Sequence, residues 1–366
     1  MAFASETAAK LTEVSPGDRV LSYLPLAHAY EHAGVFSAGL RYGLHIYFNE
    51  SLATFAADLK RARPTSFLSV PRLWVKFQLG ILQHLPQEKI DALLANPATA
   101  DATRRQILEQ LGLQEVRFAL TGSAPLPAAV LKWYRDIGLE LLEGYGMTED
   151  FGASHLSFPG RTRVGYVGEP LEGVERRISE AGEILVKSPA CMLGYYKQPE
   201  LTQESFTEDG FFRTGDMGEV DEDGRLKITG RVKELFKTSK GKYVAPVPIE
   251  NMLGSHPGVE VALVMGNGLP SAFGMVMLSA DAQRAMVGEA RDEFMRGLEQ
   301  LKDSINEKLQ SHERLEFVAV AREQWTIANG FLTPTMKVRR SIIEKHYEPA
   351  FETWFKAKSP VVWAES

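Results

Sequence analysis

The sequence has 366 residues, of which 44% are apolar and 24% are charged, and 47 acidic residues against 41 basic ones give a net charge of −6. These proportions are typical of a globular protein and exclude a disordered or fibrous chain, while the negative charge argues against a dedicated nucleic-acid-binding protein. No run of about 18 apolar residues indicates a membrane span, the N-terminus does not resemble a signal peptide, and the single cysteine, Cys191, permits no internal disulfide. We therefore expect a cytoplasmic protein.

The first part of the chain alternates between strand-like and helix-like segments. The apolar run 20–24 predicts a short strand before Pro25, and residues 65–70 and 116–120 predict two more strands. Residues 51–63 and 72–95 have the apolar spacing of amphipathic helices. This alternation is typical of a parallel sheet packed by helices.

The pattern changes between residues 160 and 230. Short β-rich runs at 176–178, 182–186 and 226–229 are separated by Gly, Pro and Asp, which predicts small antiparallel sheets. Asp221-Glu222-Asp223-Gly224 is interpreted as a hairpin turn, because the spacing of an EF-hand is absent.

A separate unit is expected after Gly230. It contains β-like runs at 259–265 and 275–278, a long amphipathic helix near 284–310, and a turn at 332–337 that leads into a basic helix start. The sequence thus predicts two domains, 1–230 and 231–366.

One motif has the spelling of a zinc site. His28-Ala29-Tyr30-Glu31-His32 matches H-x-x-E-H, in which two histidines on one helical face bind a metal and the glutamate activates its water. Only three positions are fixed and no third ligand stands out, so a packed or substrate-lining histidine is the favoured interpretation.

Two Gly-rich segments follow strand-like runs, 121–127 and 143–150. In a strand-turn-helix setting, glycines let backbone N–H groups approach a phosphate or a flat base. Tyr145 could stack on a nucleobase, Thr148 offers a hydroxyl, and Glu149 offers an oxygen ligand for Mg²⁺. The alternative is two tight turns around a buried tyrosine.

Two further residues suit the same chemistry. Asp216 follows a tight turn, where its carboxylate could accept both hydroxyls of a ribose or merely cap the turn. Lys337 could deliver a mobile cation to developing phosphate charge or belong to a solvated basic face with Arg339 and Arg340.

Together and in this order, these segments resemble the adenylate-forming superfamily, which includes acyl-CoA synthetases, firefly luciferase and peptide-synthetase adenylation domains. The resemblance rests on LSYLPLAHAYEHAG at 21–34, LTGSAPLP at 120–127, EGYGMTED at 143–150, MLGYYKQPELT at 192–202, FFRTGDMGEVDEDGRLKITGRVKE at 211–234 and TPTMKVRR at 333–340. The segments VPRLWVKF at 70–77 and LFKTSKGKYVAPVPIE at 235–250 are most similar to the long-chain fatty acyl-CoA synthetase branch.

The resemblance implies an α/β fold, in which part of a large adenylate-forming domain is followed by a small, mobile α+β C-terminal domain. It implies catalytic roles for Lys337, Thr148 and Glu149, with Glu149 as the Mg²⁺ ligand, Lys233 as the hinge, and His28, Lys240, Gly241 and Lys242 on the acyl and CoA side. The residues that it assigns to the nucleotide are Gly122, Ser123, Ala124, Pro125, Glu143, Gly144, Tyr145, Gly146, Met147, Thr148, Asp216, Arg231 and Lys337.

The sequence departs from the family in one large respect. Members carry, upstream of the LPLAH segment, a Ser/Thr/Gly-rich loop ending in Pro-Lys-Gly that wraps the β- and γ-phosphates, and this sequence contains none. The expectation is a truncated ligase with impaired adenylation, in which an upstream fragment could complete the large domain.

The implied reaction joins a fatty acid to coenzyme A through acyl-AMP, with ATP, Mg²⁺ and CoA as the other participants. Nucleic acid is not expected as a partner, and peripheral membrane contact is left open. The open alternatives are a ligase for another carboxylic acid or a carrier-protein acceptor, and a non-catalytic adenylate-binding fragment.

Overall fold

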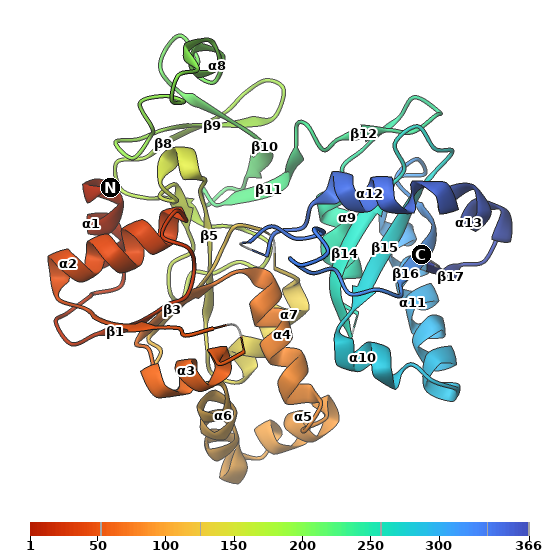
Figure 1. Cartoon of the computed structure of the whole chain (residues 1–366), viewed down its shortest axis with the longest axis horizontal. Coiled ribbons are helices and arrows are strands. Elements are labelled where there is room, and N and C mark those ends of the chain that lie inside the picture. The colour runs from red at the N-terminus through yellow and green to blue at the C-terminus, as the bar shows by residue number, and fades with distance from the viewer. Residues whose placement is uncertain (52, 125, 257, 335, 365–366) are drawn as a thin grey trace. The chain divides into compact units, whose positions relative to one another are not determined.

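The structure is a computed structural model that describes residues 1–51, 53–124, 126–256, 258–334 and 336–364 (Figure 1). The chain forms two compact units, Met1–Ile228 and Thr229–Ser366, whereas the sequence predicts a division after residue 230. Within the described ranges, no helix combines the length and the apolar character that crossing a membrane requires.

The first unit is built around a five-stranded sheet in the order β3-β4-β5-β6-β7. Its strands are β3 (Ser66–Ser69), β4 (Phe118–Thr121), β5 (Leu141–Tyr145), β6 (His155–Leu156) and β7 (Glu169–Pro170). The first three are parallel, and β6 and β7 are added antiparallel. The strands predicted at 65–70 and 116–120 are therefore confirmed.

Helices make the crossovers that parallel strands require. Between β3 and β4 lie α4 (Pro71–Leu82), α5 (Gln87–Ala95) and α6 (Pro97–Leu111), and between β4 and β5 lies α7 (Ala128–Asp136). The predicted helical stretch 72–95 is thus two helices, which residues 83–86 separate.

Buried aromatic side chains fix α4 and α7 against the sheet. The indole N–H of Trp74 donates to the carbonyl of Leu120 at 3.2 Å, and the hydroxyl of Tyr134 donates to the carbonyl of Trp74 at 2.7 Å. Both side chains are fully buried, and their rings meet edge to face at 5.0 Å. Because each polar atom has a partner, these large side chains are buried without an unsatisfied donor, and the carboxyl end of β4 is held in place.

A small parallel pair precedes the main sheet. It consists of β1 (Arg19–Ser22), the strand predicted at 20–24, and β2 (His45–Phe48). The neighbouring helices are α1 (Ala2–Leu11), the π-helix η1 (Glu31–Ser37), α2 (Ala38–Tyr42) and α3 (Phe55–Ala62), the last of which confirms the helix predicted at 51–63.

A second sheet has the order β11-β10-β9-β8, and its strand β11 runs across the boundary between the two units. Its strands are β8 (Glu175–Ile178), β9 (Glu183–Lys187), β10 (Phe212–Val220) and β11 (Leu226–Arg231), and α8 (Pro199–Glu204) lies between β9 and β10 in the chain. The predicted hairpin turn is present, because Asp221 N–H donates to the carbonyl of Arg225 at 3.0 Å and Gly224 has a φ of +82°.

The second unit contains a four-stranded sheet in the order β14-β15-β16-β17. Its strands are β14 (Val259–Met265), β15 (Ala272–Leu278), β16 (Leu315–Ala321) and β17 (Val361–Ala364), and its helices are α9 (Pro246–Leu253), α10 (Ala280–Ala285), α11 (Glu289–Lys308), α12 (Arg340–Tyr347) and α13 (Phe351–Ala357), with the 3₁₀ turn η3 (Glu348–Ala350). The predicted helix near 284–310 is mainly α11, because Gly288, with a φ of +58°, separates it from α10.

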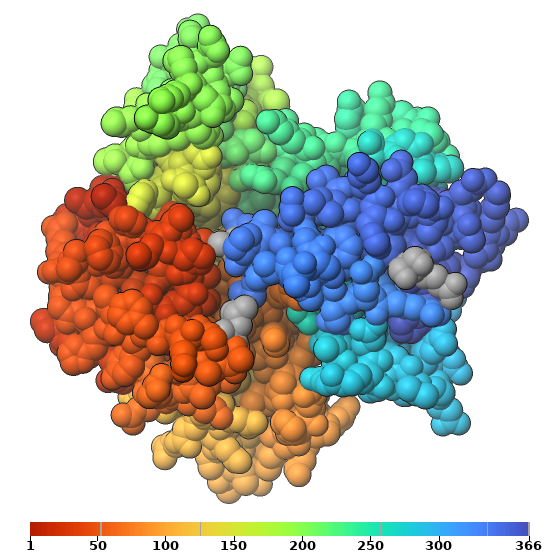
Figure 2. All heavy atoms as spheres, in the orientation of Figure 1, coloured from red at the N-terminus to blue at the C-terminus, as the bar shows by residue number. Residues whose placement is uncertain are grey.

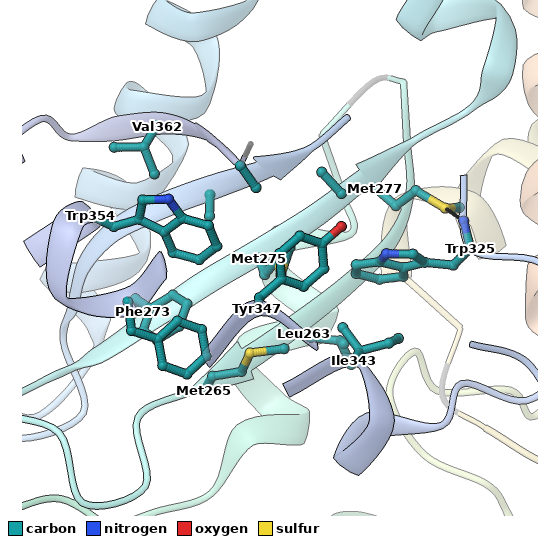
Figure 3. Close-up of a cluster of buried hydrophobic side chains, with 14 of the residues drawn as sticks. Leu263, Met265, Phe273, Met275, Met277, Trp325, Ile343, Tyr347, Trp354 and Val362 are labelled. Carbon is teal, nitrogen blue, oxygen red and sulfur yellow. Dashed lines mark hydrogen bonds between the residues drawn. The ribbon is translucent and has the colours of Figure 1, made fainter. Parts of the chain in front are cut away.

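Both faces of this sheet are buried. On β15, Phe273, Met275 and Met277 contribute to a cluster with α12 and α13, in which Tyr347 and Trp354 also pack (Figure 3). The alternate residues of β15 contribute to a second cluster with α9 and α11. Because both of its faces are covered, β15 is a continuous apolar run, as strands are in other sheets that are buried on both sides.

Candidate functional site

The two Gly-rich segments meet at the carboxyl ends of β4 and β5. The parallel register places Thr121 beside Glu143, so that the turns leaving the two strands begin next to each other. A Cβ on Gly122 would lie 3.2 Å from the carbonyl oxygen of Gly144, which leaves little room for a larger residue. The carboxyl edge of parallel strands is where ligands bind in open α/β sheets.

The turn after β4 is open to solvent. Ser123 and Ala124 are exposed, and Ser123 has a φ of +71°, a left-handed conformation that is uncommon outside glycine. Pro125, the last residue assigned to this part of the nucleotide site, lies outside the described residues.

A close backbone contact shapes the turn after β5. A Cβ on Gly146 would lie 2.6 Å from the carbonyl carbon of Gly152, so only glycine fits at this position. The chain returns to that contact because Gly152 N–H donates to the carbonyl of Met147 at 2.8 Å. The returning turn is the 3₁₀ helix η2 (Thr148–Asp150), in which Thr148 is exposed and Glu149 is half-buried.

The carboxylate of Asp150 ties this turn together. Its Oδ1 accepts the N–H groups of Met147 at 2.8 Å and Gly152 at 3.0 Å, and the residue is fully buried. Burial raises the pKa of Asp150 to about 7, against the effect of these hydrogen bonds. The sequence carries no signal for this role of Asp150.

The structure brings Tyr145 and Asp216 together from two different sheets. The hydroxyl of Tyr145, at the end of β5, donates to Oδ2 of Asp216 on β10 at 2.8 Å. Asp216 is buried, and its N–H donates to Oγ1 of Thr214 at 3.1 Å. The ring of Tyr145 lies 5.9 Å from that of His155, tilted by 56°. A flat aromatic ring and an oriented carboxylate, the groups predicted to hold a base and a ribose, are therefore neighbours.

Glu149 is held by a residue that the sequence did not single out. The hydroxyl of Tyr195 donates to Oε1 of Glu149 at 2.8 Å, and the carbonyl of Glu149 accepts the N–H of Met192 at 2.7 Å. Burial, and then Glu149 itself, raises the pKa of Tyr195 to about 12, so the tyrosine stays a donor. In nucleotide sites, Mg²⁺ is usually held by one or two carboxylates together with phosphate oxygens and waters. The oriented carboxylate of Glu149, with the Thr148 hydroxyl beside it in sequence, fits such a site.

Burial keeps two ionisable side chains of this region, Glu143 and His155, uncharged. Burial raises the pKa of Glu143 to about 8 and lowers that of His155 to about 3. Near neutral pH both side chains are therefore mainly neutral. A neutral Glu143 adds no repulsion toward the phosphates of a nucleotide.

Apart from His28, the other assigned residues lie in the second unit and are exposed. Lys337 sits in a loop closed by two hydrogen bonds to Thr333, from Thr333 N–H to the Lys337 carbonyl at 2.8 Å and from Lys337 N–H to Thr333 Oγ1 at 3.0 Å. Arg231 ends β11, Lys233 follows it, and Lys240-Gly241-Lys242 forms the turn between β12 (Phe236–Lys237) and β13 (Tyr243–Val244).

The zinc-like motif does not form a metal site. Glu31 is fully buried, where it accepts hydrogen bonds from the Ser22 hydroxyl and, at 3.4 Å, from Leu24 N–H. His28 is half-buried, and its backbone N–H donates to the carbonyl of Pro25 at 2.8 Å. Across the described ranges, no group of three His, Cys, Asp or Glu side chains is placed to hold a metal.

Comparison with known proteins shows the family to which the chain belongs. The model of the AMP-binding enzyme family matches residues 1–196, more than half of the chain, and that of the AMP-binding enzyme C-terminal domain matches residues 234–359. The chain belongs to the AMP-binding enzyme family.

Curated relatives agree with this assignment. The chain is 30% identical to the long-chain-fatty-acid–CoA ligase FadD15 of Mycobacterium tuberculosis, over 93% of this chain and 63% of that protein. It is 31% identical to the long-chain-fatty-acid–CoA ligase 5 of Mus musculus, over 93% of this chain and 56% of that protein. Across the first relatives, the chain spans between 56% and 67% of their length.

Solved structures confirm the fold class. The A domain of a carboxylic acid reductase from Segniliparus rugosus, in complex with AMP and a co-purified carboxylic acid, has a TM-score of 0.74 at 25% identity, over 96% of this chain and 58% of that one. ATP-bound MatB from Rhodopseudomonas palustris has a TM-score of 0.69 at 26% identity, over 96% of this chain and 64% of that one. The chain therefore has the α/β fold that the sequence predicts.

Proposed function

We propose that the chain is a fatty acid–CoA ligase, which forms acyl-AMP from a long-chain fatty acid and ATP and then passes the acyl group to coenzyme A. The observation that carries this proposal is the Tyr145–Asp216 pair at the carboxyl edge of the sheet, in a chain of the AMP-binding family. The names of the relatives support the fatty acid as the substrate class.

The nucleotide would use groups that the first unit already orients. The adenine would lie against the ring of Tyr145, the ribose hydroxyls would donate to Asp216, and the backbone of residues 122–124 would border the base. Thr148 would contact the α-phosphate. Glu149 would hold Mg²⁺, which supplies positive charge to the phosphates when bound.

The chemistry is an attack of one anion on another. The fatty carboxylate oxygen forms a bond to the α-phosphorus of ATP as the bond to pyrophosphate breaks, so positive charge must meet both groups. We assign that role to Lys337, which has three donors on a flexible stem. The thiolate of coenzyme A then attacks the acyl carbon and releases AMP, with Lys240, Gly241 and Lys242 on the CoA side and His28 near the acyl group.

Two positions of the second unit would serve the two steps in turn. Lys233 lies just after β11, at the start of the second unit, and is proposed as the hinge. Arg231 would also reach the ribose. Enclosing acyl-AMP between the steps protects it from water.

For residues 1–366 alone we propose slow adenylation. They contain no Ser/Thr/Gly-rich loop ending in Pro-Lys-Gly to grip the leaving pyrophosphate. Losing such donors should slow the first step by about 100-fold or more, by analogy with removing one oxyanion donor. An added polypeptide that carries such a loop would restore the rate of adenylation. The second step needs no pyrophosphate contact and should persist.

The two steps can be assayed separately. Synthetic palmitoyl-AMP with CoA should give palmitoyl-CoA, detected by mass spectrometry, faster than palmitate, ATP and CoA give it. Benzoyl-AMP and a carrier-protein thiol in parallel reactions would show whether another acid or acceptor is preferred. Binding of AMP without thioester formation from any acyl-AMP would contradict a ligase and leave an adenylate-binding protein.

A further inference from the structure

The segment between β9 and α8 reaches back to the turn that carries Glu149. Its two adjacent tyrosines face opposite ways, because the Tyr195 hydroxyl donates to Oε1 of Glu149 at 2.8 Å, whereas Tyr196 is 84% exposed. Figure 2 shows the region of α8 (green, at the top of the view) at the surface of the first unit. A surface segment thus supplies one inward hydroxyl to a carboxylate of the candidate site.

Contacts of the backbone hold Tyr195 in this position. Met192 N–H donates to the carbonyl of Glu149 at 2.7 Å, so the segment meets this residue twice. Tyr195 N–H donates to Oγ1 of Thr202 in α8 at 2.8 Å. A Cβ on Gly194 would lie 2.7 Å from Cγ2 of Thr202, which shows how closely the segment packs on α8. The Tyr195 hydroxyl is therefore directed at Glu149 by the structure around it.

The hydroxyl occupies one of the two oxygens of the carboxylate. In the part of the chain that the structure describes, Oε2 of Glu149 has neither a hydrogen-bond partner nor an ion-pair partner. A donor on Oε1 draws charge from that oxygen and fixes the orientation of the group. Oε2 is then the better ligand for a cation, and chelation by both oxygens is disfavoured.

Mg²⁺ and Ca²⁺ differ in what they require of such a carboxylate. Mg²⁺ demands a near-ideal octahedron and keeps several waters, whereas Ca²⁺ takes about six to eight oxygens and accepts carboxylates that chelate it. We propose that Tyr195 is a positioning residue that makes Glu149 a one-oxygen ligand and so selects Mg²⁺ over Ca²⁺ at the nucleotide. The inference rests on the metal-binding role that the proposed function gives to Glu149.

The test is calorimetric titration of the full chain with ATP in excess Mg²⁺ and in excess Ca²⁺. The unaltered chain should bind ATP more tightly with Mg²⁺. Tyr195→Phe removes only the hydroxyl and should weaken binding with Mg²⁺ by about tenfold, the change that one hydrogen bond to a charged group can supply. Binding with Ca²⁺ should stay unchanged or become tighter, because Oε1 is released for chelation.

Two comparisons separate this role from a general effect on the fold. Tyr196→Phe removes the exposed neighbouring hydroxyl and should change binding with neither metal. In a chain that carries Glu149→Gln, adding Tyr195→Phe should no longer alter the ratio of the two affinities, because the carboxylate on which the hydroxyl acts is gone. Titration with AMP in EDTA should give the same affinity for Tyr195→Phe as for the unaltered chain, which guards against a folding defect.

The inference would be overturned if Tyr195→Phe weakened binding equally with both metals, as a merely structural contact would, or left both affinities unchanged. An unaltered chain without preference for Mg²⁺ would overturn it as well. Because binding and not turnover is measured, the ligase proposal fails separately: no thioester from palmitoyl-AMP would contradict the ligase and leave the metal preference standing.

Discussion

The pairing of Tyr145 with Asp216 lets the ring and the hydroxyl of the tyrosine be tested separately. Tyr145→Phe removes the 2.8 Å hydrogen bond to Asp216 and keeps the aromatic face, whereas Tyr145→Ala removes both. A hydrogen bond to a charged group contributes about 1.5–3 kcal/mol to stability, so the phenylalanine variant should unfold more easily in urea. If the adenine stacks on the ring, the same variant should keep its affinity for AMP to within about threefold, because Asp216 stays available to the ribose.

The alanine variant should behave differently. Stacking of a base on an aromatic side chain is worth about 1–3 kcal/mol, which corresponds to a rise in the AMP dissociation constant of about 5- to 150-fold. Isothermal titration calorimetry with AMP gives both constants.

Tyr134→Phe is a matched control, because it also removes a hydroxyl that donates to an acceptor, the Trp74 carbonyl, in the same unit. It should lower stability and leave AMP binding unchanged. The reasoning would be refuted if Tyr145→Phe weakened AMP binding as much as Tyr145→Ala, or if Tyr145→Ala left it intact.

Three further predictions follow from buried contacts. Gly146→Ala should weaken AMP binding in the same calorimetric assay by more than about tenfold, because its Cβ would lie 2.6 Å from the Gly152 backbone; unchanged binding would mean that the turn can relax. Glu143→Gln should stabilise the protein increasingly above pH 4.5: the wild-type carboxyl, with its pKa raised to about 8, costs stability as the pH rises to that value, on the order of 2–4 kcal/mol. Urea unfolding at pH 5.5 and 8.5 measures this, and a gain independent of pH would contradict it. Arg340→Ala should lower the free energy of unfolding by about 3–5 kcal/mol, because Glu250, whose Oε1 lies 2.5 Å from Nη2 of Arg340 and whose side chain is only 13% exposed, would lose its cation; a loss below about 1 kcal/mol in urea unfolding would show that water reaches the carboxylate.

Local sequence signals predicted much of the edge at which the candidate site lies. The glycines at 122 and 146 mark turns after β4 and β5, and a parallel register brings such turns together at one edge of the sheet. Asp216 was singled out as a carboxylate after a tight turn, and Tyr145 as an aromatic ring within a Gly-rich segment. Their hydrogen bond joins two sheets and had no signal in either segment.

The residues that support the site could not be predicted in this way. Tyr195 reaches Glu149 only because the chain after β9 folds back toward η2. Asp150 acts through backbone N–H groups of its own turn, and its burial depends on packing from elsewhere. Neither contact leaves a periodic pattern in the sequence.

The strands β16 and β17 were missed for another reason. A short apolar run such as Leu315–Ala321 does not distinguish a strand from a buried helical segment. β17 has only four residues, Val361–Ala364, and is a strand because it pairs in parallel with β16. Its structure is set by a partner that lies far away in the sequence.

The most direct measurement of the central claim is a crystal structure of the chain with AMP. We expect the adenine to lie face to face with the ring of Tyr145 and the ribose hydroxyls to lie within hydrogen-bonding distance, about 2.5–3.0 Å, of the Asp216 carboxylate. AMP bound anywhere else, or a ribose that contacts neither oxygen of Asp216, would contradict the account.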